Sequence, residues 1–187
     1  MWTGIGGQGV QLAAQVLARA AVLEGRHVQL LGTYGGTMRG GSTDATLVVA
    51  DAPISTPPIV SRAWALLAMH HQFFAPLRGK LRAGSLVLVN STLFQQELDR
   101  RVWRVFELPA TARATELGSA VVGAMLLTGA FARITGLVAL ASLEEAMRAC
   151  VPSYRRQHVE LNERALRAGF DAAPELAAPA WSAEEAA

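Results

Sequence analysis

The first nine residues (1–9) read M-W-T-G-I-G-G-Q-G, and this stretch decides how the fold is interpreted. Gly4, Gly6 and Gly9 match the spacing G-x-G-x-x-G, and the alanine- and leucine-rich segment 10–24 that follows favours a helix. A glycine turn that opens a helix aims backbone N–H groups and the positive end of the helix dipole at an anion. The stretch therefore predicts a strand–turn–helix unit that either faces an anion or is a tight turn without a ligand.

Almost no strand is expected before this turn, because only Met1 to Thr3 precede the first glycine. Two explanations for this missing strand stay open. The sequence starts later than the first strand, or a partner chain completes that edge of the sheet.

Strand-like and helix-like segments alternate along the rest of the chain. The expected strands are 27–31, 43–50, 63–69, 85–90 and 104–108. The expected helices are 10–24, 73–81, 112–118, 119–133, a helix capped by Ser142 with Glu145, and 154–168 ended by Gly169. An exposed turn is expected at 80–84. The alternation predicts an α/β fold, a Rossmann-like three-layer sandwich with a mostly parallel sheet and helices on both faces.

A second glycine-rich loop is expected from Gly32 to Ser42, where five of eleven residues are glycine. Arg39 lies next to Gly40 and Gly41 in this loop. An arginine flanked by glycines is accessible and suits a phosphate or a carboxylate, although a solvated arginine in a flexible loop is the alternative. In a parallel sheet both glycine loops emerge at the carboxyl ends of strands, where ligands bind.

A free-standing dinucleotide-binding protein is the alternative to a partner-bound role for the first turn. That interpretation requires a strand before the turn, a helix after it and a carboxylate at the end of the second strand. The second strand is expected to end at Leu31 and to be followed by Gly32 and Thr33, while Glu24 precedes it. Two of the three context requirements therefore fail.

The composition excludes several classes of protein. Hydrophobic residues make up 51% of the chain and charged residues 17%, which predicts large contacts with partners or a membrane. The apolar stretch 119–134 is shorter than the ~20 residues of a membrane helix and contains Arg133, so a buried helix is expected. No signal peptide is expected, and a cytoplasmic location follows. The net charge of +2, with scattered arginines, gives no support for nucleic-acid binding.

Other reactive side chains are expected to have structural roles. His70 and His71 are expected at a strand end or in a loop rather than as metal ligands or acid–base groups. Cys150 is the only cysteine, so a cluster or zinc site held by cysteines of this chain is excluded, and a buried thiol is expected. Ser91 and Thr92 suit helix capping better than anion binding.

Taken together, the two loops resemble the gamma subunit, or gamma domain, of 2-oxoacid:ferredoxin (acceptor) oxidoreductases. The resemblance rests on G-I-G-G-Q-G-V-Q-L-A-A-Q-V-L-A-R-A-A at 4–21 and on Y-G-G-T-M-R-G-G-S at 34–42. It continues through A-P-I-S-T-P-P-I-V, L-R-A-G-S-L-V-L-V-N-S and L-N-E-R-A-L-R-A-G-F, and covers roughly 4–170. The chain departs from the family pattern at 36–38 and near Gly123.

The resemblance implies a domain at 1–170. The remaining tail at 171–187 is rich in Ala, Pro and Glu, a composition that predicts a segment extended or disordered alone, and its Trp181 could anchor it to a partner. It implies oxidative decarboxylation of a 2-oxoacid to an acyl-coenzyme A in a complex with alpha, beta and ferredoxin-like subunits. Thiamine diphosphate and [4Fe-4S] clusters belong to those partners, and coenzyme A is expected at the interface. This chain then carries no catalytic residue and is not active alone.

The residues expected to face cofactor or partner share a position on the two glycine loops. They are Gly4, Gly6, Gly7, Gln8, Gly9, Arg39, Gly40, Gly41 and Ser42. Arg39 is expected to bind a coenzyme A phosphate or a 2-oxoacid carboxylate, or else to pair with a carboxylate of a neighbouring subunit. Gln8 is expected to donate hydrogen bonds across the first turn, or simply to stabilise the loop.

Overall fold

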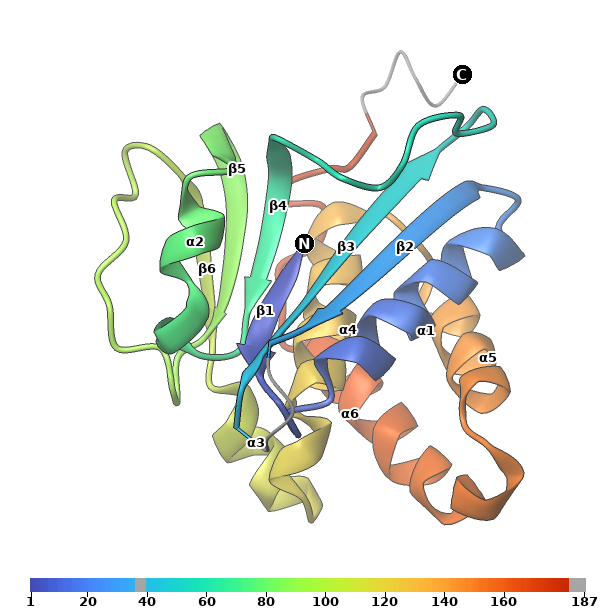
Figure 1. Ribbon diagram of the computed structural model, residues 1–187. Coiled ribbons are helices and arrows are strands. Elements are labelled where there is room, and N and C mark those ends of the chain that lie inside the picture. Colours follow the sequence, from blue (N-terminus) through green and yellow to red (C-terminus); the bar gives the residue numbers. More distant parts are fainter. Residues whose placement is uncertain (36–39, 182–187) are drawn as a thin grey trace.

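The computed structural model of the protein describes residues 1–35 and 40–181. A six-stranded sheet in the order β2-β3-β1-β4-β5-β6 forms its centre (Figure 1). The strands are β1 (Trp2–Ile5), β2 (His27–Tyr34), β3 (Ser42–Ala50), β4 (Ala63–Ala68), β5 (Leu81–Asn90) and β6 (Arg104–Leu108). The predicted α/β fold is confirmed, and each predicted strand is present.

The sheet is mixed in direction. β1 pairs with β4, β4 with β5 and β5 with β6 in parallel, whereas β3 runs antiparallel to both β1 and β2. The antiparallel pair has a simple cause, since β2 and β3 are adjacent strands joined by residues 35–41, too few for the crossover that parallel neighbours need. The mostly parallel sheet is therefore extended by one hairpin.

The first strand is the largest correction to the sequence-based expectation. β1 contains four residues, includes Gly4, and lies in the interior of the sheet between β3 and β4 rather than at an edge. Trp2 and Thr3 are buried there, with exposed fractions of 3% and 0%. The glycine turn therefore follows a strand that is held on both sides by its own chain.

Helices cover the two faces of the sheet unequally (Figure 1). The larger layer contains α1 (Val10–Leu23), α3 (Ala110–Leu117), α4 (Gly123–Thr135), α5 (Leu140–Cys150) and α6 (Val159–Asp171). The opposite face is covered by the short helices η1 (His71–Phe73) and α2 (Ala75–Arg78) and by side chains such as Phe94 and Trp103 from the segment between β5 and β6. Within the described ranges, no helix is long and apolar enough to cross a membrane.

The helix α4 is the buried centre of the larger layer. All but one of its thirteen residues are buried, Arg133 being the exception. It crosses α6 at two glycines: a Cβ on Gly129 would overlap the carbonyl group of Leu166, and a Cβ on Gly169 would overlap that of Leu126. The two backbones therefore touch directly at this crossing.

Two helix boundaries differ from the expectation. α5 starts at Leu140 after Ala139, whose side chain cannot cap the helix, and the Glu24 carboxylate at the end of α1 accepts a hydrogen bond of 2.7 Å from the Ala139 N–H. The predicted capping box of Ser142 is therefore wrong. α6 passes through Gly169 and ends at Asp171, because packing against Leu126, rather than a left-handed turn, requires that glycine.

Two further segments are also corrected. The predicted helix 73–81 is confined to η1 and α2, and the expected exposed turn 80–84 belongs largely to the start of β5, which pairs with β4 through a register shift. In the predicted tail, residues 172–181 fold back along the end of α4, where Ala178 donates to the carbonyl oxygen of Ile134 at 3.0 Å. Trp181 packs within its own chain, 4.4 Å below the Arg26 guanidinium.

Candidate functional site

The glycine turn between β1 and α1 combines tight packing on one side with open space on the other. A Cβ on Gly4 would lie 2.7 Å from the Gln8 Oε1 atom and 3.0 Å from the Cβ of Met69, so this glycine is required by packing. Gly7 is exposed, has a φ of 101° and has no atom within 4 Å of the position that a Cβ would take. Gly4 is therefore the buried, closely packed side of the turn, while Gly6 and Gly7 form its exposed surface.

Gln8 holds the turn together from within. Its Oε1 atom accepts a hydrogen bond of 2.7 Å from the Ile5 N–H, and its own N–H donates to the Ile5 carbonyl oxygen at 3.1 Å. The amide therefore closes the loop on the end of β1. The side chain therefore stabilises the loop, but as a hydrogen-bond acceptor and not as the donor that was expected.

Gly9 begins the helix and leaves its first amides facing the turn. Its φ of 78° is left-handed, which favours glycine, and no side chain of the described residues caps α1. The first turn of α1 contains no acidic residue. Unpaired N–H groups at a helix start attract negative charge, so the turn is electrostatically suited to an anion or to a carbonyl-rich surface.

The second glycine loop lies against the first. The Gly6 N–H donates to the Gly41 carbonyl oxygen at 2.8 Å, and Gly40 is exposed with a φ of 90°. Ser42 begins β3 and donates to the Asp44 Oδ2 atom at 2.9 Å. The expected meeting of the two loops at one end of the sheet is thereby confirmed for Gly40 and Gly41, whereas Arg39 lies outside the described residues.

Gln11, a residue that was not singled out from the sequence, also contributes to this arrangement. Its Nε2 atom donates to the Asp44 carbonyl oxygen at 2.7 Å and to the Thr43 Oγ1 atom at 3.2 Å. It therefore fixes the first turn of α1 on the β2–β3 hairpin. Its position one turn into a helix that follows a glycine loop is the signal that could have revealed it.

The end of β5 is joined to β4 and α3 by the buried side-chain amide of Asn90. Asn90, at the end of β5, is fully buried; its Nδ2 donates to the Met69 carbonyl oxygen at 3.1 Å and its Oδ1 accepts from the Thr111 N–H at 3.0 Å. Thr92 Oγ1 accepts from the Ala112 N–H at 3.2 Å. Asn90 Oδ1 and Thr92 Oγ1 thus accept hydrogen bonds from N–H groups at the start of α3. The capping role expected of Thr92 is confirmed, and these polar groups are bonded within the fold.

His70 and His71 follow β4 directly, as expected for a strand-end pair. Their ring centroids lie 4.4 Å apart; His70 Nδ1 accepts from the Gln72 N–H at 3.1 Å, and His71 Nδ1 lies 2.9 Å from the Leu93 carbonyl oxygen. Desolvation, assisted by the neighbouring His71, lowers the pKa of His70. Among the described residues, no group of three or more His, Cys, Asp or Glu side chains is placed to hold a metal ion.

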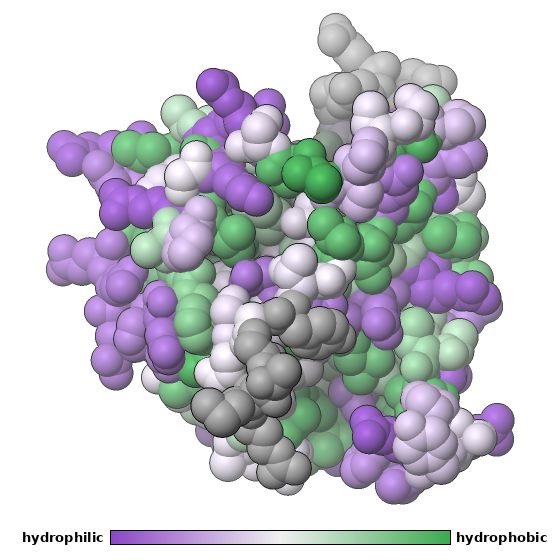
Figure 2. All heavy atoms as spheres, viewed as in Figure 1, coloured by the Kyte–Doolittle hydropathy of each residue, from purple (hydrophilic) through white to green (hydrophobic). Residues whose placement is uncertain are grey.

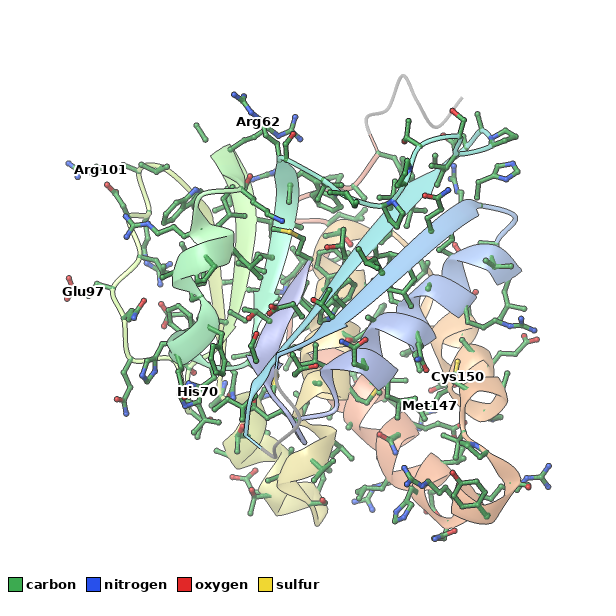
Figure 3. The ribbon with its side chains drawn as sticks, in the orientation of Figure 1. Arg62, His70, Glu97, Arg101, Met147 and Cys150 are labelled. Atoms are coloured by element: carbon green, nitrogen blue, oxygen red, sulfur yellow. The ribbon has the colours of Figure 1, made fainter. Side chains whose placement is uncertain are left out.

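Cys150 lies far from this end of the sheet. Figure 3 shows it on α5 and His70 beyond β4, on opposite sides of the molecule. The thiol is half-buried, and that burial raises its pKa above the ordinary value against a smaller opposing effect of Arg19. A raised pKa leaves less of the reactive thiolate, which agrees with a structural cysteine.

The topology argues against the dinucleotide alternative. In that fold the strand after the first helix lies beside the first strand and ends in the carboxylate that binds the ribose. Here β3 separates β2 from β1, and β2 ends at Tyr34. The residues of the glycine turn therefore lack the neighbouring acidic strand end.

The surface around the sheet differs between its two sides. Figure 2 shows hydrophilic residues gathered on the side of α2 and of the segment between β5 and β6, and hydrophobic residues exposed over the middle of the sheet. Beside the glycine turn, Val121 is 58% exposed, and its carbonyl oxygen would lie 3.1 Å from a Cβ on Gly9. The glycine turn therefore has the exposed apolar side chain of Val121 beside it, as well as N–H groups at the start of α1 that no side chain of the described residues caps.

This combination of a mixed α/β sheet and two joined glycine loops defines a class of α/β protein whose strand order differs from that of dinucleotide-binding folds. Residues 1–172 match the family described as pyruvate ferredoxin/flavodoxin oxidoreductase. The chain therefore belongs to this family, and its relatives identify it as a gamma-type subunit of an oxidoreductase.

Three relatives illustrate the likeness. The 2-oxoglutarate synthase subunit KorC of Methanothermobacter marburgensis is 35% identical over 156 residues, which cover 80% of this chain and 83% of that protein. The pyruvate/ketoisovalerate oxidoreductases common subunit gamma of Thermococcus litoralis is 28% identical over 90% of this chain and 92% of the relative. The crystal structure of a keto/oxoacid ferredoxin oxidoreductase gamma subunit from Geobacter sulfurreducens superposes with a TM-score of 0.76 at 27% identity, covering 91% and 94% of the two chains.

Proposed function

We propose that this chain is the gamma-type subunit of a complex that decarboxylates a 2-oxoacid, transfers the acyl group to coenzyme A and passes two electrons to an acceptor. The hydrogen bond between Gly6 and Gly41 carries the proposal, because it joins both glycine loops into one exposed surface at the start of α1. We name the exposed residues Gly6, Gly7 and Gly40 with their neighbours Gln8, Gly9, Gly41 and Ser42 the glycine rim. The glycine rim faces the catalytic subunits.

The iron–sulfur clusters of the reaction do not fit within this chain. Such clusters are held by several cysteine thiolates, and Cys150 is the only cysteine in the sequence. The [4Fe-4S] clusters are therefore assigned to partner alpha, beta and ferredoxin-like subunits, and the proposal also places thiamine diphosphate there, which supplies the carbanion chemistry of 2-oxoacid decarboxylation. This chain contributes shape and charge at their border and is inactive alone.

Arg39 is proposed to act at the glycine rim on the basis of its sequence position beside Gly40. A guanidinium binds phosphate or carboxylate through paired hydrogen bonds, so it suits the phosphates of coenzyme A or the carboxylate of the 2-oxoacid. A carboxylate of a neighbouring subunit is the alternative partner. The two roles differ in what they control, namely substrate affinity or assembly.

Affinity purification of the complex from its native cell tests the proposal. Larger chains that copurify with this one, together with a broad brown iron–sulfur absorbance, are the expected result. A colourless, monodisperse single chain that binds a dinucleotide would overturn it.

Kinetics of the assembled complex then separate the two roles of Arg39. We expect Arg39→Ala to raise KM for coenzyme A or the 2-oxoacid about tenfold or more while the subunits still copurify. Arg82→Ala, at an exposed position near the opposite end of the sheet, is the matched control. Loss of copurification would assign Arg39 to a subunit contact, and unchanged KM values in an intact complex would remove it from the proposal.

A further inference from the structure

The two edge strands of the sheet, β2 and β6, differ in how their outer backbone groups are protected. An edge strand leaves the N–H and C=O groups of alternate residues without a neighbouring strand. On β6, the carbonyl oxygen of Val105 accepts a hydrogen bond of 3.1 Å from the Arg100 Nη1 atom, and Arg100 also pairs with the Glu107 carboxylate. Charged side chains of this kind keep an edge strand from pairing with another chain.

The edge of β2 has no comparable protection in its own sequence. Its eight residues, H-V-Q-L-L-G-T-Y at 27–34, include no Asp, Glu, Lys, Arg or Pro. The strand pairs with β3 along its whole length without a register shift, so no bulge turns it away from a partner. His27, Leu31, Gly32 and Thr33 are exposed. A long, uncharged and regular edge of this kind is a template for a further strand.

The ladder between β2 and β3 shows which backbone groups face outward. The Gly35 N–H donates to the Ser42 carbonyl oxygen at 2.7 Å, and hydrogen-bonded pairs in an antiparallel ladder recur at every second residue. The odd-numbered residues of β2 therefore bond to β3, and Val28, Leu30 and Gly32 direct both backbone groups away from it. Among the described residues, none of these outward groups has a hydrogen-bond partner.

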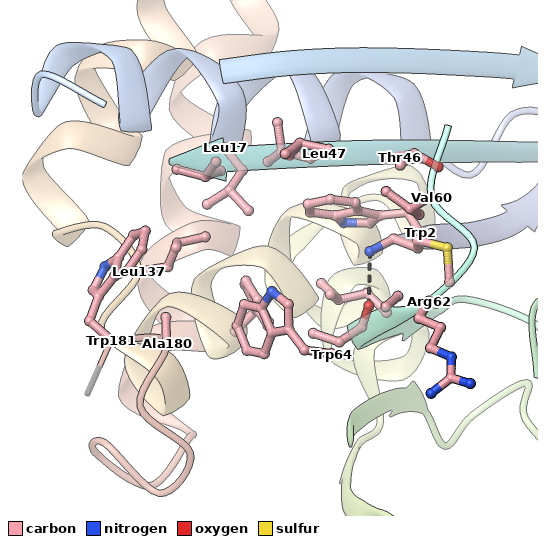
Figure 4. Close-up of a pocket in the computed structure, with 17 residues that line it drawn as sticks. Trp2, Leu17, Thr46, Leu47, Val60, Arg62, Trp64, Leu137, Ala180 and Trp181 are labelled. Carbon is pink, nitrogen blue, oxygen red and sulfur yellow. Dashed lines mark hydrogen bonds between the residues drawn. The ribbon is translucent and has the colours of Figure 1, made fainter. Parts of the chain in front are cut away.

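β3 also has unpaired residues, but they lie on an inner side of the sheet. β1 pairs with β3 only over residues 42–45, and residues 46–49 of β3 line a cavity of about 250 Å³. Leu17, Trp64 and Phe131 of the same chain line this cavity too (Figure 4). β2 lies on the other side of β3 from the cavity. The outer side of β2 is therefore the side that another chain can reach.

The three outward residues of β2 are arranged symmetrically about Leu30. If two β2 strands pair antiparallel with Leu30 on the two-fold axis, Leu30 meets Leu30 of the second copy, and Val28 meets Gly32. Each of these pairs exchanges two hydrogen bonds, so every outward group of the three residues gains a partner. On the opposite face, Leu31, which is 37% exposed, lies across from Gln29 of the second copy. No two charged side chains of the strands meet in this register.

We infer that two copies of this chain pair through β2, with Leu30 on the two-fold axis, and join their sheets into one continuous sheet. A second copy is favoured over a strand of another protein, because the same three residues satisfy both sides of the pair. The inference goes beyond the proposed function, since residues 27–33 include no residue of the glycine rim.

The oligomeric state of the purified full chain tests the pairing. At roughly 100 μM, where a dimer with a micromolar Kd is populated, we expect light scattering to report the mass of two copies. Leu31→Lys should weaken dimerisation at least about tenfold, because the two lysines would lie diagonally across the axis. Val102→Lys is the matched control, since Val102 is a 40% exposed apolar residue beside the protected edge strand β6, and it should leave the dimer intact.

Cysteine cross-linking tests the register. Gln29 and Leu31 of the second copy form a pair without hydrogen bonds, with Cα atoms ~4.5 Å apart, which a disulfide can bridge. A mixture of Gln29→Cys and Leu31→Cys chains should therefore cross-link in air at least about tenfold more than either variant alone, whose introduced cysteines lie ~7–8 Å apart across the axis. The unmodified chain gives the background from Cys150.

Two results would overturn the inference. Equal cross-linking of the mixture and of the single variants would overturn the register about Leu30. A chain that stays monomeric, and that forms no mixed disulfide in a complex co-expressed with both cysteine variants, would overturn the pairing of two copies. Slow amide exchange of Val28, Leu30 and Gly32 in that complex would then assign the edge to a strand of a partner subunit.

Discussion

Glycines perform opposite tasks in two regions of this molecule, the glycine rim and the crossing of α4 with α6. In the rim, Gly7 and Gly40 are exposed, adopt positive φ values and have open space around them. In the crossing, Gly129 and Gly169 lie inside helices, where a side chain would collide with the backbone of the facing helix. The exposed glycines are therefore required by the backbone conformation of their turns, whereas the buried helical glycines are required by packing.

The largest expected effect is at the crossing. Gly129→Ala or Gly169→Ala should lower the free energy of unfolding by about 3 kcal/mol or more, because each added Cβ must push two buried backbones apart. Chemical denaturation of the purified chain measures the change. Gly79→Ala is the matched control, since Gly79 has a helical φ of −64° and no neighbour within 4 Å of its Cβ position. Equal stability of the crossing variants and this control would contradict the proposed difference between the regions.

A smaller effect is expected from the amide within the glycine rim. Gln8→Ala removes the acceptor of the Ile5 N–H and should cost about 1–2 kcal/mol of stability. Gln8→Glu retains an acceptor oxygen and should recover most of that loss. Thermal unfolding compares the three chains, and a full loss in both variants would show that the hydrogen bond is not what stabilises the turn.

The smallest effect on stability is expected at the tip of the rim. Gly7→Ala should cost about 1 kcal/mol, because an L-residue is strained at a φ of 101° although no atom obstructs its side chain. Denaturant midpoints of this variant and of Gly79→Ala give the comparison. A cost as large as that of Gly169→Ala would mean that the rim glycines, too, are retained for packing.

Local patterns of the sequence predicted much of the fold but missed features made by distant residues. The strand segment 86–89 is a continuous apolar run, and the glycine spacing at 4–9 identified the turn correctly. The start of α5 could not be predicted, because its cap comes from Glu24, 115 residues away. Gly169 was assigned to a helix end since its actual constraint, the backbone of Leu126, is visible only after α4 and α6 pack.

In the candidate site, too, features set by local sequence were predicted and features made by distant residues were missed. Gly6, Gly7 and Gln8 were recognised from their spacing, and their placement on one turn agrees with that prediction. The link from Gly6 to Gly41 and the role of Gln11 depend on the pairing of β3 beside β1, which no local pattern specifies. The length of β1 was underestimated for a related reason, because Gly4 has low strand propensity and is held in the strand by its neighbours.

Hydrogen exchange of this chain, alone and within its purified complex, tests the central claim most directly. The glycine rim is proposed to face the catalytic subunits, so the amides of residues 6–9 and 40–42 should exchange at least about tenfold more slowly in the complex, while that of Gly79 stays unchanged. Equal exchange of the rim amides in both states, in a complex that contains the partner subunits, would contradict the claim.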